Sequence, residues 1–295
     1  MKVKEKYKGY IWYNGEFKPW QECNIHVFTN SLHYSSSAFE GIRSYNGKVF
    51  KLEEHIDRFL YSTSILGIEC IYTHRQLCDA TIELIEKNNL ENSYIRPLIW
   101  RGDKELTIKF IDNDINVMIA AYDYKQSFDI QKTLNLLVTS WRKAPANSMP
   151  HQAKTAGNYV INITALSEIK GTAYDDVLFL DNEDYVAELS SSNIFFVQDG
   201  ALITPIANCC LNGITRKTII EIAARNNIQV VEKFITLEEL RYYDEAFATG
   251  TASEVVSIKS ISFDKEGVDK VTFSDNNVTV TIAELYSDLV GANRI

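Results

Sequence analysis

Hydrophobic and polar positions follow strand-like and helix-like periods in turn along the first part of the chain. Residues 10–15 and 38–47 are apolar-rich stretches that end in Asn-Gly, so each predicts a β-hairpin. Apolar residues at helical spacing predict amphipathic helices over 51–66 and 74–89. Two further apolar strands are expected, over residues 94–100 and 115–122.

A polar stretch without periodicity, residues 123–131, predicts a linker between an N-terminal domain (1–122) and a C-terminal domain (132–295). The second domain mixes strands with helices, which predicts an α+β fold rather than a doubly wound parallel sheet. Its expected elements are a strand over 133–139, a helix over 157–169, a three-stranded meander over 177–180, 185–189 and 193–197, a helix over 213–225, and strands between 244 and 262.

Composition narrows the possible functions. The 295 residues include 30 Lys and Arg against 39 Asp and Glu, a net charge of −9 that disfavours nucleic-acid binding. No apolar run is long enough for a membrane span, and the basic N-terminus lacks the apolar core of a secretory signal, so we expect a cytoplasmic protein.

Familiar motifs of other chemistries are missing from the sequence. It contains no GxGxxG, Walker A or GxSxG motif, no HExxH pair and no CxxC pair. We therefore expect no metal site, and reduced, mostly buried cysteines.

Two side chains are candidates for covalent or acid–base chemistry. Lys154 lies in a loop with few other charges, where a lowered pKa would let its amine condense with an aldehyde; an ordinary surface lysine is the alternative. Glu188 shares a strand face with Val186, so it would need a cationic or protonated partner unless it lies in water at the strand end.

Two segments are candidates for anion binding. Residues 211–216 open a helix whose first N–H groups could bind phosphate, with simple capping by Asn212 or Thr215 as the alternative. The small residues of 248–253 could do the same or merely form a turn. Arg58 lies opposite the apolar stripe of its helix, which indicates a solvated side chain. An amine, an acid and phosphate donors together meet the requirements of pyridoxal phosphate.

The sequence resembles the class IV (fold-type IV) pyridoxal-phosphate aminotransferases, and the branched-chain amino acid aminotransferases in particular. The resemblance extends from Tyr10 to about Ser257, and the stretches 32–43 and 94–98 resemble the branched-chain subgroup. The long family signature is met by Glu188, Ser190, Asn193, Ile194, Phe195, Thr204, Leu211, Gly213, Ile214 and Arg216.

The resemblance implies a small N-terminal and a larger C-terminal α/β domain with pyridoxal 5'-phosphate at their interface, in a homodimer or higher oligomer. Lys154 would hold the cofactor covalently and move the Cα proton, and Glu188 would keep the pyridine nitrogen protonated. The other implied cofactor contacts are Arg58, Thr251 and the N–H groups of Ile214 and Thr215 at the phosphate, Tyr159 near the phenolic oxygen and Leu211 against the ring. The implied substrate contacts are Tyr94, Thr251 and Ala252 at the carboxylate, Arg96 orienting Tyr94, and Tyr34, Phe39 and Gly41 around the side chain.

The implied activity is transfer of the amino group of L-leucine, L-isoleucine or L-valine to 2-oxoglutarate in ping-pong order. A D-amino-acid aminotransferase, an aminodeoxychorismate-type lyase and a non-catalytic binder of the same fold are the alternatives. The chain departs from the branched-chain pattern at Leu189 and Asn212, where Gly and Pro are more usual. Residues 100–108 and 121–128 also replace a longer loop and a Trp-containing linker that usually touch the substrate.

Overall fold

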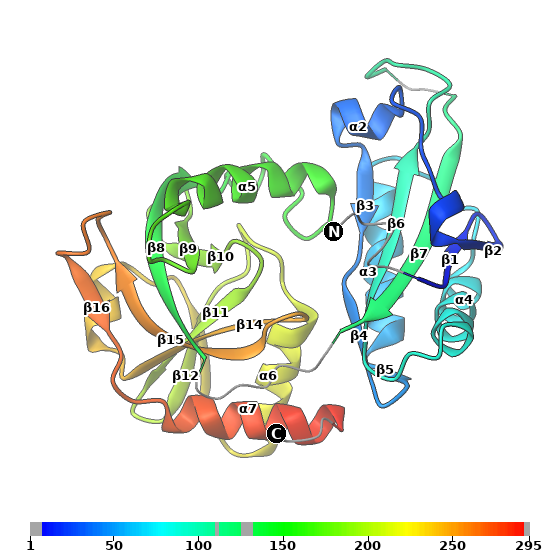
Figure 1. The fold of residues 1–295 in the computed structure, drawn as a ribbon. Helices are drawn as coiled ribbons and strands as arrows, with labels where there is room; N and C mark the ends of the chain where they lie inside the picture. Colours follow the sequence, from blue (N-terminus) through cyan, green and yellow to red (C-terminus); the bar gives the residue numbers. More distant parts are fainter. Residues whose placement is uncertain (1–7, 110–111, 125–131, 292–295) are drawn as a thin grey trace. The chain divides into compact units, whose positions relative to one another are not determined.

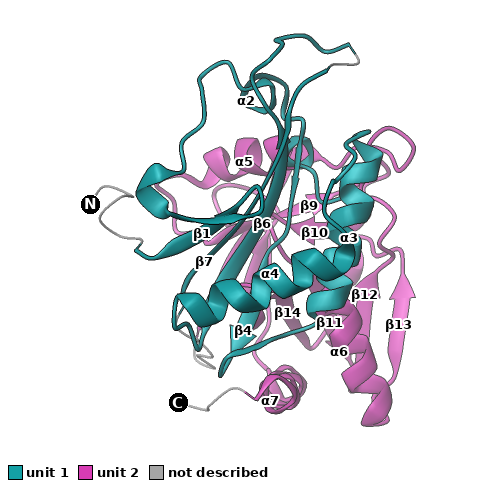
Figure 2. Ribbon diagram, turned by 90° about the vertical axis from the view of Figure 1, so that its right-hand side faces the viewer, with its two compact units in different colours: residues 1–126, 153–158 teal, residues 127–152, 159–295 magenta. Residues whose placement is uncertain are grey.

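The computed structural model describes residues 8–109, 112–124 and 132–291. It divides into unit 1, residues 1–126 and 153–158, and unit 2, residues 127–152 and 159–295 (Figure 2). The predicted linker lies outside the described residues from position 125 onward. The short segment 153–158, which contains Lys154, belongs to unit 1 although it follows the first strand of unit 2 in the sequence.

Unit 1 is an antiparallel sheet with two long helices packed on it (Figure 1). Its elements are β1 (Tyr10–Tyr13), β2 (Glu16–Pro19), the 3-10 helix η1 (Trp20–Glu22), α2 (Asn30–Tyr34), β3 (Ser37–Phe39), β4 (Ile42–Tyr45), β5 (Lys48–Val49), α3 (Leu52–Ile65), α4 (His74–Lys87), β6 (Ser93–Arg101) and β7 (Ile115–Asp123). The strand order is β2-β1-β7-β6-β4-β5, and β3 also pairs with β6.

The local sequence signals of unit 1 are confirmed. Asn14 and Gly15 have φ of 49° and 91°, and Asn46 and Gly47 have 49° and 77°, as a two-residue hairpin turn requires. Thr73 caps α4 in a reciprocal capping box with the residue three positions on. The expected helices and Asn-Gly turns therefore form where their sequence patterns place them, although the strand expected before Asn46 is divided into β3 and β4.

The core of unit 1 lies between the sheet and the helices α3 and α4, which cover one face of the sheet (Figure 2). Ile56 and Phe59 of α3 are fully buried and pack in one cluster with Ile42, Ile95 and Ile99 of the sheet. This packing fixes α3, the helix that carries Arg58, against the strands β3, β4 and β6.

Unit 2 contains a larger, mixed sheet. Its elements are β8 (Thr133–Arg142), η2 (Ala156–Tyr159), which begins in segment 153–158, α5 (Val160–Leu166), η3 (Ser167–Ile169), β9 (Asp176–Leu180), β10 (Val186–Leu189), β11 (Asn193–Gln198), β12 (Ala201–Pro205), α6 (Ile214–Arg225), β13 (Val230–Lys233), η4 (Glu238–Tyr242), β14 (Glu245–Gly250), β15 (Glu254–Ser262), β16 (Lys270–Thr272) and α7 (Asn277–Val290). The strand order is β10-β9-β8-β15-β14-β11-β12-β13, with β16 on β15. Parallel pairs join β8 to β9 and β15, and β12 to β13, and the other pairs are antiparallel.

Two expectations for unit 2 need correction, and one helix was not expected. The meander is wrong beyond its first hairpin, because β11 pairs with β12 and β14 among the described strands and not with β10. The helix expected over 157–169 is divided into η2, α5 and η3. The sequence patterns also gave no expectation for α7, whose first N–H groups are capped by the buried Glu245 at 2.8 Å and 2.7 Å.

The two faces of β9 enter different cores. Val177 and Phe179 pack with Ala165 of α5, whereas Leu178 and Leu180 join the main core formed by the other strands. Both units combine helices with sheets of this kind, so the α+β class is confirmed. Within the described ranges, no helix is both long and apolar enough to cross a membrane.

We predict that Phe59→Ala lowers the free energy of unfolding by about 3–5 kcal/mol, because it leaves a cavity in a fully buried cluster. Tyr61→Ala, on the exposed side of the same helix, is the control, since 47% of Tyr61 is accessible to solvent. Urea denaturation of both variants measures the effect. Equal losses would contradict the packing described for α3.

Candidate active site

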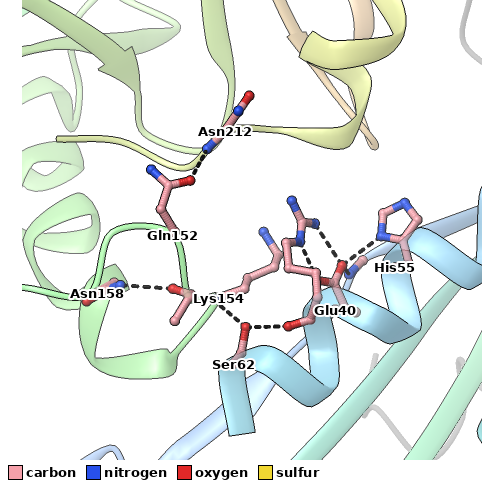
Figure 3. Close-up of polar contacts among 10 residues, drawn as sticks. Glu40, His55, Ser62, Gln152, Lys154, Asn158 and Asn212 are labelled. Atoms are coloured by element: carbon pink, nitrogen blue, oxygen red, sulfur yellow. Dashed lines mark hydrogen bonds and ion pairs between the residues drawn. The ribbon is translucent and has the colours of Figure 1, made fainter. Parts of the chain in front are cut away.

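The backbone of Lys154 is held between a strand and a helix of unit 1. Its carbonyl accepts a hydrogen bond from the Phe39 N–H at 3.1 Å, and the next residue, Thr155, forms a β-bridge with Ala38. Its own N–H donates to Ser62 Oγ at 2.8 Å, and that hydroxyl donates to the Arg58 carbonyl at 2.7 Å (Figure 3). These bonds tie the lysine to β3 and α3.

The amine of Lys154 is buried beside an aromatic ring and close to several charged side chains of unit 1. Its Nζ is 5.2 Å from the centre of the Phe39 ring. Burial lowers the pKa of Lys154 to about 8, and the positive charge of Arg58 contributes to the same shift. A larger share of this amine is therefore neutral near physiological pH than in an ordinary lysine, which is what a nucleophilic amine requires.

Arg58 belongs to a buried charge cluster rather than to the solvated face that its helical position indicated. Its Nε and Nη2 atoms donate to the two oxygens of Glu40 at 2.7 Å and 2.9 Å, and His55 Nδ1 lies 2.8 Å from the same carboxylate (Figure 3). Burial opposes ionisation of Glu40, but the charge of Arg58 and the hydrogen bond from His55 hold its pKa well below the usual range. Burial lowers the pKa of His55 as well. The cluster fixes the guanidinium on the helix that also anchors Lys154.

A second group in unit 1 joins four predicted substrate residues. Arg96 Nη2 donates to Tyr94 Oη at 2.9 Å, and its guanidinium carbon lies 4.8 Å from the centre of the Phe39 ring. A Cβ atom on Gly41 would lie 2.2 Å from Tyr94 Oη, so the tyrosine occupies the space that a side chain would need. Among the described residues, the buried Nε of Arg96 has no hydrogen-bond partner. Tyr34, at the end of α2, is more exposed than these four, at 45%.

In unit 2, Glu188 has the cationic partner that its position on the strand required. Lys143 Nζ lies 2.9 Å from Glu188 Oε1 and donates to Asn162 Oδ1 at 2.9 Å. Only 6% of the Lys143 side chain and 13% of the Glu188 side chain are accessible. The alternative of a solvated glutamate at a strand end is therefore wrong.

The N-terminus of α6 has no side-chain cap. Gly213 is its N-cap residue, and neither Asn212 nor Thr215 caps the first turn as the alternative interpretation expected. The Asn193 amide donates to the Leu211 carbonyl at 2.9 Å, and its oxygen would lie 2.3 Å from a Cβ on Gly213. Glycine therefore lets the chain pass close to Asn193, and the first N–H groups of the helix are left for another acceptor.

The predicted anion loop of unit 2 is a tight turn between β14 and β15. Ser192 Oγ and Ser253 Oγ are 3.1 Å apart, and a Cβ on Gly250 would lie 3.2 Å from both. Thr251 and Ala252 form the turn itself. Two further predicted cofactor contacts also lie in defined structure. The carbonyl of Leu211 accepts the hydrogen bond from the Asn193 amide. Tyr159 is the last residue of the 3-10 helix η2.

Sequence reasoning missed the residues that support these groups. It gave no role to Glu40, His55 or Ser62 in unit 1, or to Lys143 and Asn162 in unit 2. The one available signal was a buried charge that needed a partner, and the sequence did not show which distant residue supplied it.

Comparison with known proteins identifies the family. The amino-transferase class IV family matches residues 37–261, so the chain belongs to that family. A probable branched-chain-amino-acid aminotransferase of Rickettsia bellii is 45% identical over 282 residues, which is 95% of this chain and 96% of the relative. The chain is therefore an aminotransferase by family, as the signature from Glu188 to Arg216 predicted.

Solved structures agree with this assignment. The T.th. branched-chain amino acid aminotransferase, crystallised with pyridoxamine 5'-phosphate, aligns with a TM-score of 0.89 at 36% identity and covers 96% of this chain and 94% of its own. The same enzyme complexed with N-(5'-phosphopyridoxyl)-L-glutamate aligns with a TM-score of 0.88 at 37% identity, over 96% and 94% of the two chains. The predicted fold-type IV architecture is confirmed.

We predict that the Lys154 amine loses its proton near pH 8 rather than near the ordinary value of 10.5. A lowered pKa means that the neutral amine accumulates at lower pH, so its labelling by formaldehyde and cyanoborohydride should rise through pH 8. Mass spectrometry of the cofactor-free protein measures this, with the exposed Lys48 as internal reference. A labelling midpoint above pH 10 at Lys154 would contradict the prediction.

We also predict that Gly41→Ala destabilises unit 1 by about 1–3 kcal/mol, because the new methyl group overlaps the Tyr94 hydroxyl. The double variant Gly41→Ala/Tyr94→Phe lacks the overlapping hydroxyl. Its loss of unfolding free energy should therefore be smaller than the sum of the losses in the two single variants. Urea denaturation of the four proteins gives the coupling energy. Strictly additive losses would show that the contact is unimportant.

Proposed function

We propose that this protein transfers the amino group of L-leucine, L-isoleucine or L-valine to 2-oxoglutarate, with pyridoxal 5'-phosphate as cofactor. The observation that carries the proposal is the amine of Lys154, held by β3 and α3 with its pKa lowered to about 8, in a chain of the class IV family. The name of the Rickettsia bellii relative supports the branched-chain donors.

The donor set fits this cofactor. Lys154 and Arg58 of unit 1 offer an amine for its aldehyde and a fixed guanidinium for its phosphate. The uncapped first turn of α6, at Ile214 and Thr215, and the hydroxyl of Thr251 are further phosphate donors. Glu188 would face the pyridine nitrogen. Tyr159 and Leu211 complete the expected contacts, at the phenolic oxygen and the ring.

When bound, the cofactor supplies an electron sink that stabilises negative charge at the substrate's Cα atom. The chain's contribution is to hold and move protons around it. The Lys154 amine, partly neutral near pH 8, can accept the Cα proton and return it at the neighbouring carbon. Glu188 would accept a hydrogen bond from the protonated pyridine nitrogen and so keep that proton in place.

We propose that the substrate carboxylate is bound by Tyr94 and by the N–H groups of Thr251 and Ala252. Arg96, which donates to Tyr94, would orient the phenol, and its buried Nε is a donor suited to an anion. Phe39, Gly41 and Tyr34 would surround the apolar side chain.

An apolar pocket explains why several branched donors should be accepted. Burial of one branched side chain is worth about 1.5–3 kcal/mol, whereas one missing methylene is discriminated by only about 1–3 kcal/mol. For the acceptor, the glutamate adduct bound by the T.th. enzyme supports glutamate and 2-oxoglutarate as the second substrate pair. A single site that serves both substrates in turn implies two half-reactions in ping-pong order.

We predict that Lys154→Ala lowers leucine-dependent formation of glutamate from 2-oxoglutarate by about 10²–10⁴-fold or more, because the amine proposed to move the Cα proton is removed. Lys48→Ala, on an exposed hairpin, should retain activity. The wild-type protein should use L-leucine, L-isoleucine and L-valine but not D-alanine. Turnover of D-alanine without L-leucine would identify a D-amino-acid aminotransferase, and release of pyruvate from aminodeoxychorismate would identify a lyase.

A further inference from the structure

Lys143 is a buried cation that the proposed function does not yet require. It follows β8 directly, and its N–H donates to the Leu180 carbonyl of β9 at 2.9 Å. Its side chain is 6% accessible, whereas lysine is rarely buried unless it is paired. The preceding residue, Arg142, has 39% of its side chain accessible and pairs with Asp184 at the surface. The chain therefore directs one of two adjacent cations into the interior.

The ammonium group of Lys143 is fully engaged. It lies 2.9 Å from Glu188 Oε1, donates to Asn162 Oδ1 at 2.9 Å, and lies 4.4 Å from the centre of the Phe179 ring. These are three partners for three N–H bonds, two of them oxygens and one a π face. The amine therefore has one defined position.

Asn162 is itself fixed so that its oxygen faces the lysine. Its amide nitrogen donates to the Ser190 carbonyl at 2.5 Å, and Ser190 follows Glu188 by two residues. The carboxylate, the lysine and the amide thus form a closed set that links β10, the end of β8 and α5. A set of this kind restricts the Glu188 side chain to one rotamer.

We propose that Lys143 is the positioning residue for Glu188: it occupies Oε1, and thereby presents Oε2 as an anionic acceptor to the protonated pyridine nitrogen of the cofactor. The inference rests on the proposed function. Two physical effects support it. A carboxylate this buried is costly as an anion unless a cation is close, and a carboxylate with one oxygen fixed has less freedom to lose on binding a ligand.

The buried thiol of Cys210 does not compete with Glu188 for the ammonium group of Lys143. Burial raises the pKa of Cys210 well above its ordinary value, and the negative charge of Glu188 adds to the effect. Cys210 therefore remains a neutral thiol next to the carboxylate.

The test compares two cofactor probes that differ at one ring atom. 1-Deazapyridoxal 5'-phosphate keeps the aldehyde, the phenol and the phosphate of pyridoxal 5'-phosphate but has a C–H group in place of the pyridine nitrogen. The ratio of the two dissociation constants, measured by absorbance titration of cofactor-free protein, isolates the contact with that nitrogen. A merely structural role for Lys143 would weaken both probes equally and leave the ratio unchanged.

We predict that wild-type protein prefers pyridoxal 5'-phosphate, and that Lys143→Met reduces this preference by about tenfold or more, because a hydrogen bond to a charged group loses strength when the carboxylate is no longer held in place. Lys143→Arg, which keeps the cation, should restore most of the ratio. Glu188→Gln should abolish the preference, and adding Lys143→Met to it should change the ratio no further. Arg142→Met is the matched control, an ion-paired cation at the adjacent position.

The outcomes separate this inference from the proposed function. An unchanged ratio in Lys143→Met overturns the role of Lys143 while leaving the proposed function intact. A wild-type protein that binds both probes equally well overturns the contact between Glu188 and the ring nitrogen, and the role of Lys143 with it. A wild-type protein that binds neither probe overturns the proposed function. If Lys143→Met does not fold, Lys143→Gln, neutral but able to form hydrogen bonds, decides in its place.

Discussion

Charge compensation inside weakly polar surroundings is the constraint on which the candidate site depends. An ionised side chain removed from water is stable only beside an opposite charge or a full set of hydrogen bonds. Each unit contains a pair that meets this condition at the candidate site, Arg58 with Glu40 in unit 1 and Lys143 with Glu188 in unit 2. In both pairs the partners come from different elements, so the pairing also fixes how those elements pack.

The anchoring of Lys154 shows how a reactive group can be attached to a rigid framework. The residue lies on a short segment outside any long helix or strand, and its backbone is bonded to β3 on one side and to Ser62 of α3 on the other. α3 is in turn held by the buried side chains of Ile56 and Phe59. The position of the Lys154 backbone thus depends on the hydrophobic core of unit 1.

Local patterns predicted what depends on local structure. The Asn-Gly hairpins, α3, α4 and α6 form where turn chemistry and periodicity place them. The division of the helix after Tyr159 and the pairing of β11 depend on tertiary packing, so period and propensity alone could not give them. For α7, the spacing of Val278, Ile282 and Tyr286 is itself a helical signal in the sequence, so this helix was open to prediction.

The site was predictable to the same extent. Lys154 and Glu188 could be selected because their chemistry is unusual for their surroundings, and the need of Glu188 for a cation followed from its position on a strand. That Lys143 supplies the cation did not follow, because the two residues are 45 positions apart in sequence. The prediction that Arg58 is solvated was wrong for a similar reason. Helical periodicity shows which face of the helix is apolar, but it does not show that the Glu40 carboxylate, between β3 and β4, contacts the opposite face.

The Glu40–His55 contact makes unit 1 intrinsically sensitive to acid. Both groups have a lowered pKa in the folded protein. Each of them therefore binds a proton at a higher pH in the unfolded chain than in the folded one. As the pH falls below the ordinary values of 6.5 for histidine and then 4.5 for glutamate, protons favour the unfolded chain at each step. Acidification therefore destabilises the folded state through the same charge cluster that fixes Arg58 on the helix anchoring the lysine, so that loss of function and loss of structure share one electrostatic origin.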